Sequence, residues 1–554
     1  MEIKNISEIY AALPQCGAFL KAVADKSVKH VFLDGLRASS ASVFFAAMAG
    51  VESEKLKAKL KKTKAKDGSQ CLIAVFVLQD SDEAGYFYHD LTQMLGTTDV
   101  LFFPSSYRRA VKYGQRDAAN EILRTEALSR LSAAAGVPAD SARDGGSAFL
   151  YVVTCPEALS ELVVSKRRLD ERTMDIAVGD IVSLTDLGRR LRELGFREVD
   201  YVYEPGQFAM RGSIVDVYSY SSELPFRIDF FGDEVDTIRT FEVADQLSKE
   251  PRTTVRIVPE LSRIAEDRQP FTALLPDCAL LVMKDRLYTC SAVEQIYNEG
   301  FSKQAMTERL EGATEMEQQQ IVRDMRKENN LVSPVAFREE ICRFRLVELG
   351  VQPTGTPQTV IPFNISPQPL FHKNFELLAQ SLEDYLLQGY RLYILADSEK
   401  QTRRLKEIFE SDELRVARHQ KSPDSEALSV ADRIDFTPVD RTLHEGFADN
   451  DLRICFFTDH QIFDRFHKYS LKSDAARTGK MALTMKELQE MEPGDFIVHV
   501  DFGIGKFGGL VRVPVGDSYQ EAIRIYYQRG DIVDVSIHSL YKISKYRRCD
   551  GAYR

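Results

Sequence analysis

A strand, a glycine and an apolar helix in "LDGLRASSASVFFAAM" (33–48) have the outline of a phosphate-binding loop. Aligned on G-x-x-x-x-G-K-[ST], Gly35 takes the first glycine position and Ser42 the final hydroxyl. Ser40 and Ala41 stand where that loop needs glycine and lysine. Glycine lets main-chain N–H groups wrap the phosphates, and lysine neutralises their charge. We therefore expect this degenerate loop neither to bind ATP tightly nor to hydrolyse it. A plain strand–loop–helix connection is the favoured interpretation.

A second glycine-rich stretch, "VHVDFGIGKFGG" (498–509), contains D-F-G overlapping G-x-G-x-x-G. A dinucleotide-binding loop must open a helix, but the following "GGLVRVPVG" cannot start one. The chain also lacks the H-R-D and V-A-I-K motifs of a kinase. Period-2 alternation instead places Phe496, Val498 and Val500 on one face of a strand, and similar strands follow near 521–527 and 531–537. Short strands joined by glycine turns predict a small antiparallel β-barrel, which we expect to be SH3/Tudor-like.

No catalytic or metal-binding constellation is visible in the sequence. H-E-x-x-H, G-x-S-x-G and EF-hand motifs are absent, and the nine histidines are spread singly, with His499 expected to be structural. The eight cysteines form no C-x-x-C pair, which argues against a zinc site and fits a reducing cytoplasm. We expect no catalytic residues, no metal and no cofactor in this chain.

The overall charge restricts the choice of partners. With a formal net charge of −11, the 554-residue chain lacks the basic character of a general nucleic-acid-binding protein. A lysine run from Lys55 to Lys66 is either a solvated helix face, which we favour, or a contact to a phosphate backbone. We find no apolar stretch long enough to span a membrane, and we expect a cytoplasmic location.

The elements that would position these residues alternate along the chain. Residues 30–155 read as strands and helices of an α/β domain with a mostly parallel sheet. An amphipathic helix at 184–196, with Gly195 as its C-cap, precedes an antiparallel meander. A proline cluster at 351–369 predicts a linker, and a second, smaller α/β unit follows it. The fold class is therefore multidomain α/β and α+β.

Two stretches resemble known families. Residues 197–248, "REVDYVYEPGQFAMRGSIVDVYSY…", are similar to a stretch shared by bacterial transcription-repair coupling factors and the excision-repair helicase UvrB. Residues 493–546 resemble the RNA-polymerase-interacting domain of the coupling factors, which UvrB lacks. The degenerate loop at 35–42, and the short segment 105–114 where UvrB has a DNA-clamping hairpin, also favour the coupling factors. The resemblance implies an N-terminal portion that lacks the ATP-driven DNA translocase, the part that uses ATP and contacts double-stranded DNA.

The resemblance also implies a division into domains and a set of partners. It suggests a UvrB-like domain 1 in two segments, an inserted UvrA-binding domain 2, a small domain 3 and a polymerase-binding barrel, with linkers between them: 1–154, 155–243, 244–350, 351–369, 370–466, 467–484 and 485–554, in chain order. The expected partners are UvrA, through Arg197 and Arg211, and the RNA polymerase β subunit, through Val511, Arg512 and Val513. From the residues alone, Arg211 could instead pair with Glu204 or Asp216, and the two valines could be core residues.

A different class of function stays open. The chain could be a degenerate helicase-like protein that binds DNA directly, through the lysine run or through Arg108 and Arg109. Its acidity and the missing hairpin argue against this alternative.

Overall fold

The computed structural model describes most of the chain. It covers residues 1–50, 72–134, 149–409, 434–469 and 491–545, with short gaps at 108–110, 112–113, 115, 244–245, 262–266, 311–314, 466, 468, 500–501, 516–517, 528–529 and 537–542. The lysine run at 55–66, and Arg108 and Arg109, lie outside the described residues. Two compact units result: one takes 1–116, 130–166 and 265–471, and the other takes 117–129, 167–264 and 472–554.

A seven-stranded parallel sheet is the centre of the first unit and confirms the predicted parallel α/β domain. Its order is β17-β1-β16-β15-β2-β4-β3. The strands are β1 (His30–Asp34), β2 (Leu72–Val77), β3 (Val100–Phe103), β4 (Phe149–Thr154), β15 (Leu280–Met283), β16 (Arg345–Gly350) and β17 (Thr359–Pro362). Their near-continuous apolar runs are typical of parallel strands that helices cover on both faces.

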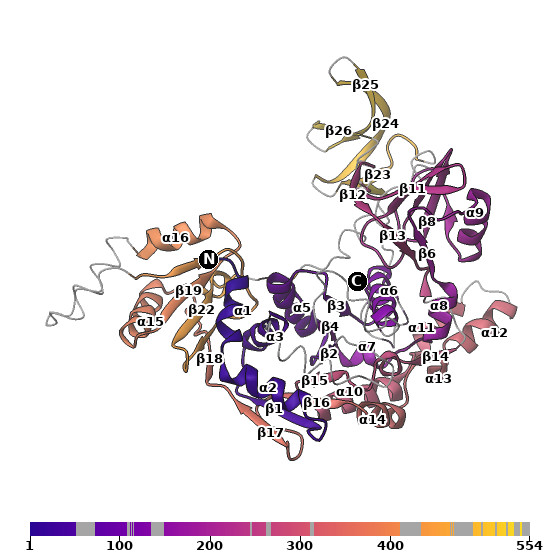
Figure 1. The fold of residues 1–554 in the computed structure, drawn as a ribbon. Helices are drawn as coiled ribbons and strands as arrows, with labels where there is room; N and C mark the ends of the chain where they lie inside the picture. The colour runs from indigo at the N-terminus through magenta and orange to yellow at the C-terminus, as the bar shows by residue number, and fades with distance from the viewer. Residues whose placement is uncertain are drawn as a thin grey trace. The chain divides into compact units, whose positions relative to one another are not determined.

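The first unit contains many helices besides this sheet. They are α1 (Lys4–Ala11), α2 (Pro14–Ala24), α3 (Ser40–Gly50), α5 (Ser81–Leu95), α7 (Pro156–Leu159), α10 (Arg286–Glu299), α11 (Lys303–Leu310), α12 (Glu315–Asp324), α13 (Lys327–Asn330), α14 (Pro334–Ile341) and the 3₁₀ helix η3 (Phe271–Leu274), while most of α6 (Ala118–Ala134) belongs to the second unit. Figure 1 shows α3 and α5 beside β2, β3 and β4. On α3, Phe44 and Phe45 are almost fully buried, as an apolar helix against a sheet should be.

The second unit contains the predicted helix and meander. A six-stranded sheet has the order β12-β11-β10-β9-β8-β7 and is antiparallel except where β7 meets β8. Its strands are β7 (Arg197–Glu198), β8 (Gln207–Arg211), β9 (Ile214–Val217), β10 (Phe226–Phe231), β11 (Glu234–Phe241) and β12 (Ser248–Arg252). Leu187 and Leu191 of α9 (Leu184–Glu193) pack in its core with Phe208, and Gly195 ends the helix with φ +89°, as expected of a C-cap.

The boundaries of this inserted region differ from those expected. The sheet continues past residue 243, because β12 pairs with β11, and β6 (Met174–Ala177) then pairs with β13 (Thr254–Ile257). The preceding segment likewise continues past residue 154, because β5 (Leu162–Val164) pairs with β14 (Arg268–Pro270) in the first unit. The sequence gives little sign of β12, because every residue of this strand is exposed and no apolar alternation marks it. The short helix α8 (Lys166–Arg172) connects β5 to β6 along the chain.

The proline cluster at 351–369 is not the linker that we expected. It supplies β17, the edge strand of the parallel sheet, and β18 (Ile365–Pro367), an edge strand of the next sheet. Pro362 and Pro367 are the last residues of these strands. Proline lacks an N–H and is tolerated in a sheet mainly at such edges, so the residues that suggested a linker are compatible with strands.

The smaller α/β region follows in the same unit. Its five strands have the order β18-β21-β22-β19-β20, with β19 parallel to both β20 and β22. They are β19 (Arg391–Leu395), β20 (Thr437–Val439), β21 (Phe447–Asp449) and β22 (Ile454–Thr458), besides β18. Figure 1 shows α15 (Phe375–Leu387) and α16 (Glu399–Phe409) beside β19 and β22. The Tyr10 hydroxyl of α1 donates to Asp449 Oδ2 at 2.7 Å, so the N-terminal helix binds this region.

The C-terminal strands form a five-stranded antiparallel sheet. Its order is β26-β25-β24-β23-β27. The strands are β23 (Phe496–His499), β24 (Gly503–Val515), β25 (Ser518–Tyr526), β26 (Ile532–Ser536) and β27 (Ile543–Lys545). On β23 the buried residues are Ile497 and His499, while Phe496 is 52% exposed, so the parity is opposite to that of the apolar set suggested by the sequence. None of the described helices is both long and apolar enough to cross a membrane.

Candidate protein-interaction sites

Gly35 has a packing role in the turn that follows β1. Its φ is +87°, a conformation that side chains with a Cβ rarely adopt. A Cβ on Gly35 would collide with the main-chain oxygen of Phe363. Phe363 N donates to Asp34 O at 2.8 Å, just beyond β17. The glycine therefore allows the segment after β17 to cross close to the loop.

Hydrogen bonds within the protein occupy the hydroxyls of the degenerate loop. The Ser40 hydroxyl donates to Arg37 O at 2.6 Å and accepts from Arg37 N at 3.0 Å. The Ser42 hydroxyl points toward Asp90 of α5, with 3.5 Å between Ser42 Oγ and Asp90 Oδ2. Ala41 offers no polar group. The loop thus forms internal contacts at the positions where a phosphate loop would present donors.

Residues 444 and 445 of the smaller α/β region bind Ser39 of this loop and Asp90 of α5. His444 N donates to Asp90 Oδ1 at 2.7 Å, and Glu445 N donates to Ser39 Oγ at 2.9 Å. Asp90 is almost fully buried, and this burial raises its pKa to about 7. The place of a phosphate site is thus taken by a contact between two parts of the first unit.

Arg211 forms an ion pair inside the second unit. Its guanidinium donates to Asp216 and, at 2.8 Å, to the main-chain oxygen of Asp200, and it lies 4.8 Å from the centre of the Tyr201 ring. Arg227 donates to both oxygens of the same Asp216 at 2.8 and 2.9 Å. The carboxylate is fully buried, whereas 34% of the Arg211 side chain is exposed. The local pairing with Asp216 is therefore observed, and a role of Arg211 in binding UvrA stays a prediction.

Arg197 is the more accessible of the two arginines. It lies on β7, is exposed, and its N donates to Gly206 O at 2.8 Å. Within the described part of the chain we find no hydrogen bond or ion pair of its guanidinium. Arg197 is aligned with Gln207, and Arg211 lies four residues further along β8. At about 3.3 Å per residue, the two positions are roughly 13 Å apart along the strand, within the span of one protein interface. Phe208, also on β8, is fully buried.

The strand β24 has an edge that is open along part of its length. The neighbouring β23 pairs only with Gly503–Lys506. The main-chain N–H and C=O of Phe507 still bond to Asp495 O and Gly494 N, just before β23. From residue 510 to 515, the pairings among the described residues are with β25 alone. The main-chain groups on the other side of residues 510–515 are therefore available to an added strand.

The three predicted contact residues lie on this open segment. Val511 and Val513 are half-buried, and the neighbouring Leu510 is 51% exposed. Arg512 is aligned with Glu521 of β25, and its side chain lies outside what the structure describes. The register shifts between Phe507 and Leu510, where β24 has a bulge. Sequence and structure thus agree on a strand at 511–513, while contact with the polymerase stays a prediction.

Sequence reasoning missed one cluster of side chains. His444, His460 and His467 come together in the smaller α/β region, with one ring nitrogen of each lying within 4.8 Å of the others. The signal was present in the sequence, since three of the nine histidines lie between residues 444 and 467. They follow different elements, so only the fold reveals their proximity.

Comparisons with known proteins match both stretches singled out in the sequence. A model described as the UvrB interaction domain matches residues 174–262, which include β6 through β13. A model described as the CarD-like/TRCF RID domain matches residues 491–547, which include β23 through β27. The chain is also similar to the transcription-repair-coupling factor of Bacillus subtilis (strain 168), at 22% identity over 95% of this chain and 46% of the relative.

Other relatives carry the same description. Transcription-repair-coupling factors of Staphylococcus aureus strains bovine RF122 / ET3-1 and USA300 are 20% and 21% identical, each over 81% of this chain and 42% of the relative. The chain resembles the N-terminal portion of a transcription-repair-coupling factor. It spans less than half the length of these curated relatives. The match to the UvrB interaction domain therefore occurs in a chain that also matches the RID domain.

Proposed function

We propose that this chain is a protein-interaction scaffold that links RNA polymerase to nucleotide excision repair. The observation that carries the proposal is the presence of both matched domains, at 174–262 and 491–547, in one chain similar to coupling factors over 95% of its length. In this role the C-terminal sheet binds the polymerase β subunit, and the region around β6–β13 recruits UvrA to lesion-stalled transcription.

The geometry of β24 supports the polymerase contact. An extended segment of a partner can add to an open strand edge, where main-chain hydrogen bonds provide affinity and alternate side chains provide specificity. Residues 510–515 offer such an edge, with Leu510 exposed beside Val511 and Val513. We further propose that the five strands curve into an SH3/Tudor-like barrel, whose remaining surface supports this edge.

The second unit supports the contact with UvrA through its arginines. A guanidinium keeps its charge and offers a rigid fork of donors for a partner carboxylate, and arginine is enriched among interface hot spots. Arg197 has its guanidinium in solvent, and Arg211 presents about a third of its side chain. Asp216, held by two arginines, would fix the orientation of Arg211 before a partner arrives.

A pull-down with purified partners tests the proposal. The untagged chain is incubated with immobilised UvrA, with the immobilised polymerase β subunit, or with an unrelated acidic protein as control. We expect retention on both partners and none on the control. Failure to bind either partner would overturn the scaffold function. Strong binding to double-stranded DNA that falls steeply with salt would instead favour the helicase-like alternative, because such binding reports contacts to phosphates.

A further inference from the structure

Two of the three clustered histidines, His444 and His460, lie just beyond the carboxyl ends of parallel strands. Asp397 follows β19, Thr442 and His444 follow β20, and His460 lies in the short helix α18 (Asp459–Ile462) directly after β22. The central β19 pairs with β20 on one side and with β22 on the other. In open α/β sheets the crevice outside such strand ends, where the connections diverge to both sides, is the usual place for a ligand.

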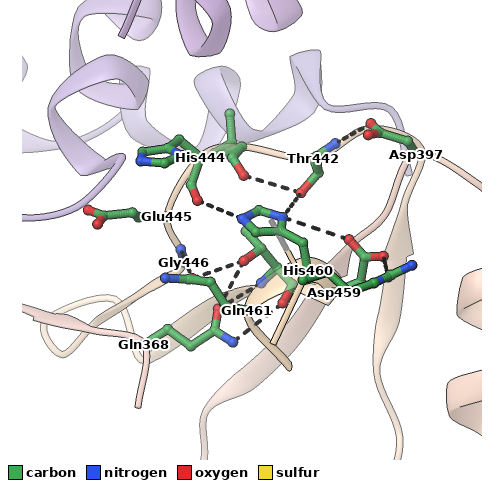
Figure 2. Close-up of polar contacts among 12 residues, drawn as sticks. Gln368, Asp397, Thr442, His444, Glu445, Gly446, Asp459, His460 and Gln461 are labelled. Carbon is green, nitrogen blue, oxygen red and sulfur yellow. Dashed lines mark hydrogen bonds and ion pairs between the residues drawn. The ribbon is translucent and has the colours of Figure 1, made fainter. Parts of the chain in front are cut away.

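Hydrogen bonding determines which nitrogen of His460 is available. Figure 2 shows the His460 ring between the main-chain oxygen of His444 and the side chains of Thr442 and Asp459. His460 Nε2 is 2.8 Å from His444 O, which can only accept, so Nε2 must carry the proton. In the neutral ring Nδ1 then has the lone pair. Metal-binding histidines commonly donate their other N–H to a main-chain carbonyl in this way.

The other two histidines each have a buried nitrogen without a hydrogen bond. Nδ1 of His444 and Nδ1 of His467 have no partner among the described residues. Leaving such a group unsatisfied in the protein interior is unfavourable, and each case calls for a missing partner. The His444 ring is held by stacking on Tyr86, with 3.6 Å between ring centres and 12° between planes.

Two carboxylates lie near the three rings. Asp397 Oδ1 accepts from Thr442 N at 3.0 Å, and Asp459 Oδ1 is 3.9 Å from His460 Nδ1, while Asp459 Oδ2 pairs with Arg465. Carboxylate oxygen and imidazole nitrogen are both common ligands of Zn²⁺.

We propose that His444, His460 and His467 bind a divalent transition-metal ion, with Zn²⁺ as the ion that best fits their chemistry. Neutral imidazole suits Zn²⁺, Cu²⁺ and Ni²⁺, whereas Mg²⁺ and Ca²⁺ prefer oxygen ligands. Asp459 Oδ1, 3.9 Å from His460 Nδ1, is placed to provide a fourth ligand for a tetrahedral ion.

Binding requires only a limited adjustment of the side chains. Zn–N bonds of about 2.0–2.1 Å in tetrahedral geometry place ligand nitrogens roughly 3.4 Å apart, compared with separations of up to 4.8 Å here. The His467 ring now stacks on His460, with 4.5 Å between ring centres, so it must turn to direct its lone pair at the ion. His467 is half-buried.

The ion would hold the segment that follows α18 against the β20–β21 loop. His467 lies beyond α18, whereas His444 lies in the loop that binds Asp90 near the degenerate phosphate loop. The Tyr86 hydroxyl already donates to His467 O at 2.9 Å. A metal ion shared by these residues would connect the β20–β21 loop, α18 and the following segment in one cross-link.

Zinc and cobalt titrations of the untagged, chelator-treated chain test the proposal. We expect saturable binding of one Zn²⁺ per chain by calorimetry, a raised thermal midpoint with Zn²⁺ but not with Mg²⁺, and the visible absorption of tetrahedral Co²⁺ when cobalt replaces zinc. These readouts use the unsubstituted protein. Absence of saturable Zn²⁺ binding, or an octahedral Co²⁺ spectrum, would overturn the proposal.

Substitutions identify the ligands. His467→Asn is the first choice because the residue is half-buried, and His444→Asn follows. Loss of a residue that only hydrogen-bonds to a metal ligand typically lowers metal affinity by about 10–100-fold. Loss of a ligand itself should cost no less, so the Zn²⁺ affinity of each variant should fall at least about tenfold. His372→Asn is the matched control: His372 is exposed, with φ +48°, which asparagine tolerates. Equal Zn²⁺ affinity in His467→Asn and His372→Asn would contradict the site.

Discussion

Arg197 and Arg211 differ in how freely their guanidinium groups can reach a partner. Arg197 is exposed, whereas Arg211 is already bonded to Asp216 and to Asp200 O. Replacing Arg211 removes one of two cations from a buried carboxylate and can disturb the sheet by itself. Arg197 is therefore the better position for testing a direct contact.

We predict that Arg197→Ala weakens UvrA binding by roughly thirtyfold or more. Loss of one partner of a desolvated charge pair at an interface typically costs about 2–5 kcal/mol. Surface plasmon resonance measures the effect, and Arg252→Ala, also exposed but on β12, is the control. Polymerase binding should not change. If the Arg197→Ala, Arg211→Ala double variant keeps full UvrA affinity, the site lies elsewhere.

Asp90 gives a pH-dependent prediction at the same scale. Burial raises its pKa to about 7, so between the ordinary aspartate value near 4 and pH 7 the folded protein holds a proton that the unfolded chain has released. The stability associated with Asp90 is therefore full below about pH 4 and is lost as the pH rises through 7.

Asp90→Asn should remove this dependence. Asparagine keeps an oxygen to accept from His444 N but cannot ionise. As the pH rises from 4 to 8, we expect the free energy of unfolding of the variant to increase relative to that of the wild type. The relative increase should be on the order of a few kcal/mol at pH 8. Thermal midpoints measured across this range test it. Both proteins contain the same buried histidines, so the pH dependence that these histidines contribute cancels in the difference between the two thermal midpoints. A constant difference between the two proteins would contradict the assignment.

At the scale of elements, the open edge of β24 is the decisive feature. A charged, bulky side chain on this strand should block an added strand more readily than it unfolds the sheet, because Val513 is only half-buried. The fully buried residues Ile497, Ile523 and Ile525 form the core instead.

We predict that Val513→Arg abolishes binding to the polymerase β subunit while the sheet stays folded. Ile532→Arg on β26, an edge strand at the far end of the sheet, is the matched control and should bind normally. Far-UV circular dichroism checks folding, and a pull-down measures binding. Persistent binding by a folded Val513→Arg variant, or unfolding of the sheet, would show that 511–513 is not the contact strand.

For the whole molecule, the contact between the smaller α/β region and the degenerate loop predicts a chain that does not use ATP. Ser39 and Asp90 are bonded to residues 444 and 445, and Ser40 is bonded to Arg37. Equilibrium dialysis with Mg-ATP should therefore detect no tight binding, and no turnover should be measurable. The double substitution Ser40→Gly, Ala41→Lys should not restore either. ATP turnover that disappears in Ser42→Ala would contradict this prediction.

The sequence by itself determined the elements that have strong periodicity. The α/β domain expected over 30–155 contains β1, β2, β3 and β4, and the helix expected at 184–196 with its Gly195 cap corresponds to α9. Long apolar or amphipathic patterns are reliable because local geometry imposes them. The motifs at 197–248 and 493–546 likewise identified both regions that the family models match.

Only the tertiary structure decided features that depend on distant parts of the chain. The prolines at 362 and 367 end edge strands because neighbouring strands are present to pair with them. Arg211 pairs with Asp216 rather than Glu204. The register of β8 and β9 aligns Asp216 with Ala209, which is two residues from Arg211 and on the same face of the sheet. His444, His460 and His467 meet because the β20–β21 loop, α18 and the segment after α18 come together in the fold. Such proximity follows from strand order and register, which a pattern of residue types along the chain does not encode.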